Sequence, residues 1–496
     1  MRTIPASEAA RLCGGTLRGP VETLVGPDVV TDSRRTTPGA LFVALPGEHV
    51  DGRDFVPAAI AAGAAAVLVA SPVAEVTVPQ IVVPDAREAL SALARGLVRE
   101  AVADHGLITL ALTGSSGKTT TKDLLAQVLS EAGPTVAPAG SFNNEVGVPL
   151  TACEIDAATR FLIAEMGARG PGDVAWLCGI VPPRIGAVIN VGTAHLGEFG
   201  SREAIAAAKG ELVEALPPDG VAVLNADDPL VAGMADRTGA RLAWFSAGAP
   251  VIEGARIEAA SLSVRAEDQQ ADDLERYGFR LVGRREGMRF DEAVQLRLVG
   301  AHAVPDALAA AAMALAAGLA PAVVARALSA AEERSPWRMA LYELPGGAVL
   351  VNDAYNANPD SMRAALDTIG TMIARRRLAH PNAAATAVLG DMLELGDESA
   401  ELHRAIGGHA AERGIGVIAV GSYAAETVAG ALAAGGQAVQ APLGEVRERL
   451  ALAPGDVVLV KASRGLGLPA DELDRRGLGL ERLAQAIVDE REGRAS

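Results

Sequence analysis

The chain has few aromatic residues, few cysteines and no excess of positive charge. Only 3% of its 496 residues are aromatic although half are hydrophobic, and it carries 54 Gly and 28 Pro. This balance excludes a disulfide-stabilised miniprotein, a collagen and a charge-rich disordered chain, and leaves a large globular protein. The three cysteines, Cys13, Cys153 and Cys178, are odd in number and far apart, which fits neither a disulfide framework nor a zinc cluster and indicates a reducing cytoplasm.

Acidic residues outnumber basic ones, 61 Asp and Glu against 44 Lys and Arg, so the formal net charge is −17. A field of that sign repels phosphate backbones and anionic lipids, and we therefore expect neither a nucleic-acid partner nor binding to a membrane surface. An anionic ligand must instead be held by local groups, such as helix N-termini, a few Lys or Arg side chains and metal ions.

No segment has the continuous apolar character of a membrane span or a secretory signal. Residues 56–74 and 307–325 are uncharged and long enough to span a bilayer, but alanine dilutes them and Gly and Pro interrupt them. We interpret both as packed segments that contain helix. Residues 1–15 lack an apolar h-region, so we expect a cytoplasmic protein without membrane insertion.

The length predicts about three domains, since domains cluster near ~100–200 residues. We place them at 1–104, 105–333 and 334–496. The first mixes short strands and helices, with turn signals such as Pro38-Gly39 and Asp51-Gly52. It is expected to be a compact α/β domain.

The second domain opens with an apolar run at 107–112, followed by a Gly-rich turn and a helix. Further apolar runs separated by helical segments predict a parallel sheet built from βαβ units. A polar stretch at 261–297 is expected to form peripheral strands and loops, and an Ala-rich helix pair should follow at about 305–331. The further runs lie at 161–164, 185–189 and 221–224.

The third domain follows a linker at 332–336 and again alternates short apolar runs with helical stretches. This pattern predicts a doubly wound, Rossmann-like domain that binds ligands at the carboxyl ends of its strands. The fold class is therefore α/β, with a central parallel-sheet P-loop domain between an N-terminal α/β domain and a C-terminal Rossmann-like domain. The apolar runs lie at 348–351, 386–389, 417–420 and 457–460.

A glycine-rich turn lies between the first predicted strand and helix of the central domain. In Thr113-Gly-Ser-Ser-Gly-Lys-Thr119, backbone N–H groups can surround a phosphate, Lys118 can neutralise it and the Thr119 hydroxyl can hold Mg²⁺. The usual phosphate-loop pattern has Gly at the position of Leu112, so this is a variant. A chance Gly/Ser turn is the alternative, but the strand–loop–helix context favours a nucleotide phosphate.

Three polar residues follow or lie near strand ends of the same domain. Glu165 comes directly after the run 161–164, where a carboxylate can ligate Mg²⁺, although a capping or surface role is the default for a single Glu. His195 follows a strand in the same way, and a lone His is as readily structural. Lys209 lies in a helical stretch and would by itself be a solvated residue.

These motifs, in this order, resemble the Mur ligases, the ATP-dependent amino-acid ligases of peptidoglycan synthesis, whose phosphate loop also lacks the first glycine. The matches span nearly the whole chain, and their colinear order leaves little room for coincidence. They are Thr31-Asp-Ser-Arg34, Gly39-Ala-Leu-Phe-Val-Ala-Leu45, Asp51-Gly-Arg-Asp-Phe55, Asn143-Asn-Glu-Val-Gly-Val-Pro-Leu-Thr151, Glu165-Met-Gly167, Ala194-His-Leu196, Phe199-Gly-Ser201, Asn225-Ala-Asp-Asp-Pro229, Asn352-Asp-Ala-Tyr-Asn-Ala-Asn-Pro359, Leu389-Gly-Asp-Met-Leu-Glu-Leu-Gly396 and Val460-Lys-Ala-Ser-Arg464.

The resemblance implies an ADP-forming ligase that joins D-alanyl-D-alanine to UDP-N-acetylmuramoyl-tripeptide through an acyl phosphate, using ATP and Mg²⁺ and acting as a monomer. A ligase for another amino acid and a folylpolyglutamate-synthetase-like enzyme are alternatives within the superfamily, and the Asp-Ser-Arg module speaks against the latter. A P-loop ATPase that drives a shape change and a nucleotide-binding scaffold without turnover are alternatives of other classes.

The resemblance also implies roles for individual residues. Lys118, His195, Lys209 and Arg338 would be catalytic, with Arg338 reaching toward the γ-phosphate. Metal ligands would be Thr119, Glu165, His195 and Lys209, the last as a carbamate that turns a cation into an anionic ligand. The nucleotide would be bound by Thr113, Gly114, Ser115, Ser116, Gly117, Lys118, Thr119, Thr120, His302, Asp306, Arg338, Asp353 and Asn356.

Asp353 would contact the ATP ribose. The remaining implied roles concern the two other substrates, and the forked guanidinium of Arg464 suits the carboxylate of the dipeptide. The uridine-nucleotide site would include Asp32, Ser33 and Arg34, its sugar side Asn143 and Asn144, and the site of the dipeptide carboxylate Lys461, Ser463 and Arg464.

One nucleotide-site segment departs from the family. The usual His-Asn-Val-x-Asn-Ala-Leu-Ala-Ala is here His302-Ala-Val-Pro-Asp-Ala-Leu-Ala-Ala310, so that Ala303 and Asp306 replace both asparagines. Because Asp lacks the amide donors of Asn, the contact made by the second Asn is expected to be weaker or differently arranged.

Overall fold

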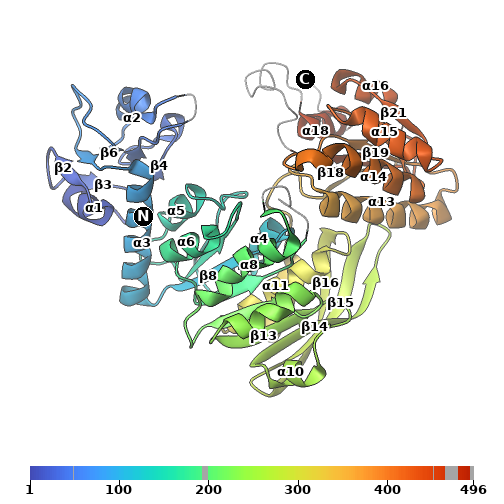
Figure 1. Cartoon of the computed structure of the whole chain (residues 1–496), viewed down its shortest axis with the longest axis horizontal. Helices are drawn as coiled ribbons and strands as arrows, with labels where there is room; N and C mark the ends of the chain where they lie inside the picture. Colours follow the sequence, from blue (N-terminus) through green and yellow to red (C-terminus); the bar gives the residue numbers. More distant parts are fainter. Residues whose placement is uncertain (48–49, 193–198, 451, 464–478, 492–496) are drawn as a thin grey trace.

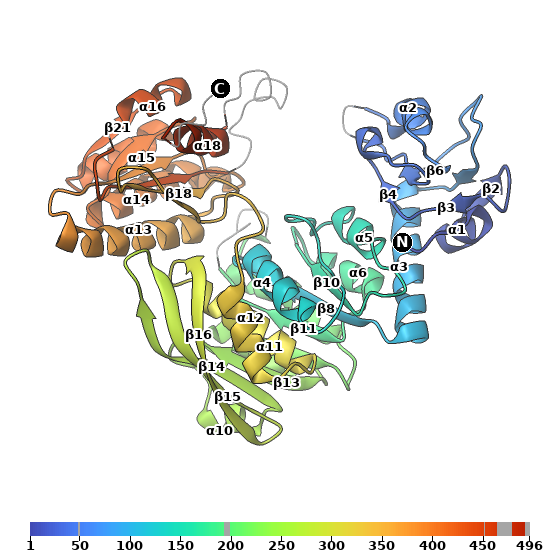
Figure 2. The ribbon, with the colours of Figure 1, turned by 180° about the vertical axis from the view of Figure 1, so that it is seen from behind.

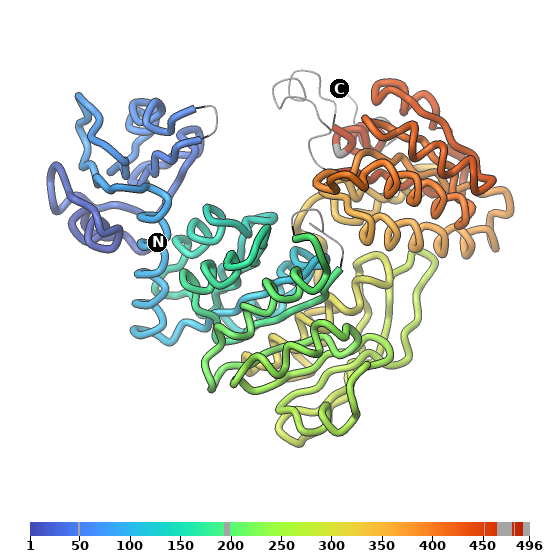
Figure 3. The backbone as a smooth tube through the Cα atoms, viewed as in Figure 1, coloured from blue at the N-terminus to red at the C-terminus, as the bar shows by residue number. Residues whose placement is uncertain are grey.

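The computed structural model describes residues 1–47, 50–192, 199–450, 452–463 and 479–491. Three bodies follow one another along the chain, and Figures 1 and 2 show the first and the third standing apart on either side of the second. The colours of the tube in Figure 3 pass from body to body without returning. Each body combines a parallel-rich sheet with helices, so the predicted α/β fold is confirmed.

The N-terminal body contains, in its described residues, a five-stranded sheet in the order β2-β7-β6-β5-β4. Its central strands are buried throughout, as parallel strands covered on both faces should be. A long helix, α3, starts where the Asp85 side chain accepts two backbone N–H groups, and it leads into the central body. The elements are β1 (Ile4–Pro5), α1 (Ala6–Cys13), β2 (Thr16–Arg18), β3 (Leu24–Val25), β4 (Val29–Val30), β5 (Leu41–Val43), α2 (Val56–Ala61), β6 (Ala66–Val69), β7 (Gln80–Val82) and α3 (Ala86–His105).

The central body is built on a nine-stranded sheet, counted over the described ranges, in the order β16-β15-β14-β13-β12-β11-β8-β10-β9. The strands from β9 to β14 are parallel, and their side chains alternate between two cores. Leu110 and Leu112 pack with α4 and α11 on one face, and Ala111 belongs to the core that includes α3 on the other. The first elements are β8 (Ile108–Thr113), α4 (Lys118–Ser130), β9 (Thr135–Val136), α5 (Gly147–Ala152), β10 (Phe161–Glu165), α6 (Asp173–Ile180), β11 (Ile185–Val188), α8 (Arg202–Glu214), β12 (Val221–Asn225), α9 (Pro229–Ala232) and β13 (Arg241–Ser246).

The polar stretch at 261–297 forms longer and more regular strands than the sequence predicted. β14, β15 and β16 pair antiparallel and extend the sheet. Polar residues do not interrupt them, because an antiparallel edge can be solvated on one face. The Ala-rich helix pair is present, and α11 is buried along most of its length. These elements are α10 (Gly254–Ala259), β14 (Leu262–Ala271), β15 (Arg276–Arg285), β16 (Met288–Val299), α11 (Ala303–Ala316) and α12 (Pro321–Ala330).

The third body has a sheet in the order β17-β18-β22-β19-β20-β21, in which β17 is antiparallel and the others are parallel. β22 comes last in the chain but lies between β18 and β19, so three carboxyl ends meet there. No helix among the described residues is long and apolar enough to cross a membrane. The elements are β17 (Ala340–Glu343), β18 (Val349–Asp353), α13 (Pro359–Ala379), β19 (Ala385–Leu389), α14 (Ser399–Glu412), β20 (Gly416–Ala419), α15 (Ala424–Ala433), β21 (Ala438–Gln440), α16 (Val446–Arg449), β22 (Val457–Lys461) and α18 (Leu480–Arg491).

Besides the connecting segment, the turn between β14 and β15 joins the central and third bodies (Figures 1 and 2). Arg375 of α13 donates to the carbonyl oxygens of Ala271 at 2.8 Å and Asp272 at 2.6 Å. Its guanidinium also lies 3.0 Å from the carboxylate of Glu275, a residue that is 1% exposed. A buried carboxylate therefore depends on a cation from the neighbouring body.

Replacing Arg375 by Met should weaken this interface by about 1–3 kcal/mol, because a buried charge is left unpaired while the removed arginine is itself partly exposed. Urea denaturation would measure the loss. Arg413→Met is the control, since it removes an exposed pair with Asp367 inside the third body and should cost less than ~1 kcal/mol. Equal losses in the two variants would contradict the expectation.

Candidate active site

A cavity of about 1280 Å³ lies where the carboxyl ends of the central strands face the third body. Residues of both bodies line it, including the turn after β8, Glu165, Lys209, Asp353 and Lys461. Ligands of open α/β sheets bind at these strand ends. Most residues that the sequence singled out therefore surround one space.

The turn after β8 is shaped by Gly117 and Asn190. Gly117 has a φ of 76°, in the left-handed region, and an added Cβ would overlap the carboxylate of Asp306. The Asn190 side-chain oxygen accepts the N–H groups of Ser115 at 2.9 Å and Ser116 at 3.0 Å. The turn is therefore fixed both by its glycine and by the neighbouring strand end.

Lys118 and Thr119 begin α4 at the cavity. The Lys118 Nζ donates to the carbonyl of Gly114 at 2.6 Å, and the Thr119 hydroxyl lies 2.7 Å from that of Ser141. Removal from water lowers the pKa of Lys118, while the neighbouring Glu165 opposes that shift. Ser115, Ser116, Gly117 and Thr120 also line the cavity, whereas the Thr113 hydroxyl donates to the carbonyl of Met166 at 2.8 Å.

Glu165 ends β10 next to the turn after β8 (residues 113–119), here called the phosphate turn, as the partner of Leu112 across the strand pair. It is 1% exposed, and Asn143 donates to its Oε1 at 2.8 Å. Its Oε2 is buried without a hydrogen-bond partner in the described part of the chain. A buried acceptor left without a partner costs ~1–3 kcal/mol, so this oxygen points to a cation or donor supplied by a ligand.

Lys209 lies in the middle of α8 and is 4% exposed, so it is not the solvated residue that a helical lysine would be by default. Burial, together with the charge of Lys118, lowers the pKa of Lys209 to about 7. Near neutral pH, a large fraction of this lysine therefore carries a neutral amine.

Asp306 lies in the first turns of α11, against Gly117. It is 4% exposed, and burial raises the pKa of Asp306 to about 8, while Thr121 and Arg338 oppose the rise. At neutral pH a protonated Asp306 can donate a hydrogen bond, as an Asn amide does. The departure from the family pattern is therefore smaller chemically than it is in the sequence. His302 precedes α11, and burial lowers its pKa.

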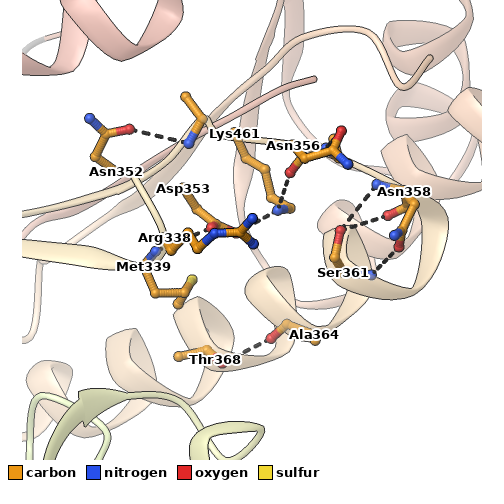
Figure 4. Close-up of polar contacts among 12 residues, drawn as sticks. Arg338, Met339, Asn352, Asp353, Asn356, Asn358, Ser361, Ala364, Thr368 and Lys461 are labelled. Atoms are coloured by element: carbon orange, nitrogen blue, oxygen red, sulfur yellow. Dashed lines mark hydrogen bonds and ion pairs between the residues drawn. The ribbon is translucent and has the colours of Figure 1, made fainter. Parts of the chain in front are cut away.

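Arg338 reaches from the third body to the phosphate turn. Its guanidinium donates to the Ser141 hydroxyl at 2.9 Å and lies 4.2 Å from the centre of the Tyr355 ring. The next residue, Met339, has a φ of 56° and donates its N–H to Asp353 at 3.1 Å (Figure 4). A strained segment thus places the arginine beside Asp353.

Lys461 and Asp353 end two adjacent strands and are direct partners in the sheet. The Lys461 Nζ lies 2.5 Å from the Asp353 carboxylate and 3.0 Å from the Asn356 carbonyl oxygen (Figure 4). Ser463 donates to the carbonyl of Ala357 at 3.0 Å and accepts the N–H of Leu393 at 3.1 Å. Lys461 and Ser463 of the Val460–Arg464 motif therefore both contact neighbouring protein groups. Their binding of a dipeptide stays a prediction.

The residues expected at the uridine nucleotide lie elsewhere. Asp32 accepts the backbone N–H of Arg34 at 3.0 Å and pairs with its guanidinium at 2.8 Å, with Ser33 between them. All three belong to the N-terminal body and do not line the cavity. Arg87 of α3, in contrast, does line it. Asn143 and Asn144 do line the cavity. His195 and Arg464 lie outside the described residues.

Two residues of the site were missed in the sequence. Asn190 directly follows the apolar run 185–189, the same signal that singled out Glu165, and could have been found. Ser141 lies two residues before a recognised motif and carries no signal of its own; its role as a neighbour of both Thr119 and Arg338 depends on tertiary packing. Within the described ranges, no three His, Cys, Asp or Glu side chains are grouped as a metal cluster.

Three family models match the chain. The Mur ligase family catalytic domain matches residues 28–97, the Mur ligase middle domain matches 112–314, and the glutamate ligase domain of the Mur ligases matches 337–464.

Individual proteins are similar over nearly the whole length. The UDP-N-acetylmuramoyl-tripeptide–D-alanyl-D-alanine ligase of Mycobacterium leprae is 41% identical, over 90% of this chain and 92% of its own. A crystal structure of MurF from Acinetobacter baumannii superposes with a TM-score of 0.80 at 28% identity, covering 99% of each chain. The MurF ligase of Thermotoga maritima in complex with ADP gives a TM-score of 0.71 at 25% identity, covering 94% of this chain and 98% of that one. The chain belongs to the Mur ligase family.

Proposed function

We propose that the chain joins D-alanyl-D-alanine to the terminal carboxylate of UDP-N-acetylmuramoyl-tripeptide, with ATP converted to ADP and phosphate. One observation supports this most directly: a single cavity contains the phosphate turn, the buried lysines Lys118 and Lys209, and the third-body residues Arg338 and Asp353. The similar curated proteins carry the same activity in their names. Since ATP and a UDP-linked substrate are cytoplasmic nucleotides, the proposed reaction belongs to the cytoplasm.

The chemistry requires a free carboxylate to become reactive toward an amine. Transfer of the γ-phosphoryl group of ATP to the carboxylate gives an acyl phosphate, whose phosphate can then leave. Two anions approach each other in this step, and Lys118 and Arg338 are the cations placed to offset their repulsion and the charge that develops in transfer. Arg338 comes from the third body, so the step requires both bodies to meet the same nucleotide.

Magnesium fits the residues at the turn. The Oε2 of Glu165, which has no partner among the described residues, and the hydroxyl of Thr119 are oxygen donors of the kind that Mg²⁺ accepts alongside phosphates. When bound there, Mg²⁺ would neutralise phosphate charge. We assign these two residues as its protein ligands, and Lys209, as a carbamate, as a further anionic ligand.

The amine of the dipeptide completes the reaction by attacking the acyl carbon. An unperturbed α-amino group has a pKa near ~8, so a fair fraction is neutral without a dedicated base. The protein must then mainly hold the three reactants in line.

Ligation itself is the first test. With ATP, nucleotide tripeptide and D-Ala-D-Ala together, the purified chain should form ADP, phosphate and the pentapeptide. Liquid chromatography and mass spectrometry would detect these products. Tripeptides ending in meso-diaminopimelate and in lysine should both be offered. ADP release that needs neither peptide substrate would favour an ATPase or switch, and turnover with a different amine alone would favour another ligase.

Gly117→Ala should weaken nucleotide binding strongly. The added methyl group meets the Asp306 carboxylate and strains a left-handed backbone, so affinity for an ATP analogue should fall by about 100-fold. Titration calorimetry would measure it. Gly140→Ala is the control, because Gly140 is also left-handed but has open space around its Cβ position; a similar loss in that variant would refute the steric explanation.

The carbamate at Lys209 predicts that a positive charge there is not what catalysis needs. A neutral amine is the form that reacts with CO₂, and the pKa of about 7 makes that form available at neutral pH. Lys209→Arg and Lys209→Met should both lower kcat by about 100-fold or more, because neither forms the anionic ligand. Retention of most activity in the arginine variant, or an unmodified amine in the active enzyme by mass spectrometry, would exclude the carbamate.

A further inference from the structure

Lys461 is a buried cation whose charge is already matched inside the protein. The residue is 1% exposed at the end of β22, between β18 and β19. A buried ammonium is costly unless it is paired and hydrogen-bonded. Both conditions are met here by the Asp353 carboxylate at 2.5 Å and the Asn356 carbonyl oxygen at 3.0 Å (Figure 4).

The family resemblance implies a nucleotide-binding role for both of these partners. Asp353 ends β18, and Asn356 lies in the loop between β18 and α13; both line the cavity. Asp353 and Asn356 already accept from two of the three N–H groups of the Lys461 ammonium, so a ligand carboxylate could bind only the third. The position of Lys461 in the sheet therefore directs its charge toward Asp353 and not toward a free acceptor substrate.

Asp353 also links Lys461 to the segment that carries Arg338. Its second oxygen accepts the N–H of Met339 at 3.1 Å, and Tyr355 donates its N–H to the carbonyl of Trp337 at 3.1 Å. Trp337 and Met339 both have left-handed backbones, which cost of order 1 kcal/mol each and need support from their surroundings. Each carboxylate oxygen can accept about two hydrogen bonds, so Asp353 can do this and still accept from a ribose hydroxyl.

We propose that Lys461 is a positioning residue of the nucleotide site: it orients Asp353 toward the ribose, and through Asp353 it holds the segment that carries Arg338. It does not bind the carboxylate of the acceptor dipeptide. The proposal rests on the proposed function, because it divides the roles of the third body between the two substrates of that reaction.

Lys461→Met keeps the apolar stem and removes the ammonium. It should raise the KM for ATP and the dissociation constant of a non-hydrolysable ATP analogue by about tenfold, lower kcat, and leave the KM for D-Ala-D-Ala within about twofold. D-Alanyl-D-alaninamide, which lacks the carboxylate, should be discriminated against by the variant as strongly as by the unchanged enzyme.

Two further variants separate positioning from simple loss of stability. Arg376→Met is the matched control: Arg376 binds the carbonyls of Gly347 and Gly455, just before the opposite ends of the same two strands, and does not line the cavity. It should lower stability without changing the ratio of the two KM values. In an Asp353→Asn background, where the partner carboxylate of Lys461 is also gone, Lys461→Met should change nucleotide affinity by less than about twofold.

A rise in the KM for D-Ala-D-Ala with loss of the discrimination against the amide would overturn the proposal, since that is the signature of a carboxylate ligand. So would a further tenfold loss of nucleotide affinity in the Asp353→Asn background. Nucleotide binding is measured without acceptor or tripeptide. If the unchanged enzyme binds the analogue but forms no pentapeptide, the proposed function fails while the binding measurements still decide the role of Lys461.

Discussion

Repulsion between two anions is the constraint on which this structure depends. A polyphosphate and a carboxylate must come into contact inside a chain whose net charge is −17. The cations that we propose to offset this repulsion are gathered at one edge of the central sheet and held by short contacts: Lys118 to the carbonyl of Gly114, and Arg338 to Ser141. Local groups there work against the overall field, as they must for an acidic protein that binds anions.

The groups of the proposed site are divided among the bodies. The phosphate turn belongs to the central sheet, whereas Arg338 and Asp353 come from the third body, and the N-terminal body carries the Asp32 to Arg34 turn. A second contact, between Arg375 and the β14–β15 turn, ties the central and third bodies together away from the connecting segment. Together with the contact of Arg338 to Ser141, this attachment limits how the third body can turn relative to the phosphate turn.

How much the sequence could predict depended on how local each signal was. The β8–turn–α4 unit was readable because strand, glycine turn and helix are adjacent, and Glu165 because it directly follows an apolar run. The burial of Lys209 could not be predicted, because the sequence of its helix has no pattern that separates a buried lysine from a solvated one. The pair of Lys461 and Asp353 joins residues 108 positions apart. The pair forms because β22 inserts beside β18, and neither the Asn352–Pro359 motif nor the Val460–Arg464 motif predicts this strand order.

Asp306 shows the same limit in another form. The replacement of Asn by Asp removes the amide donors, and the sequence therefore predicted a weaker or rearranged contact with the nucleotide. In the structure, burial raises the pKa of that carboxyl to about 8, so the neutral form that can donate a hydrogen bond is present at neutral pH. The environment of the side chain, set by α11 packing on the phosphate turn, decides what the residue can do.

Oxygen tracing tests the central chemical claim most directly. UDP-N-acetylmuramoyl-tripeptide labelled with ¹⁸O in both oxygens of its terminal carboxylate would be converted with ATP and D-Ala-D-Ala, and the released phosphate analysed by mass spectrometry. An acyl phosphate predicts one ¹⁸O atom in each phosphate released, because the bridging oxygen leaves with it when the amine attacks. Unlabelled phosphate alongside a lengthened peptide would contradict the acyl-phosphate route.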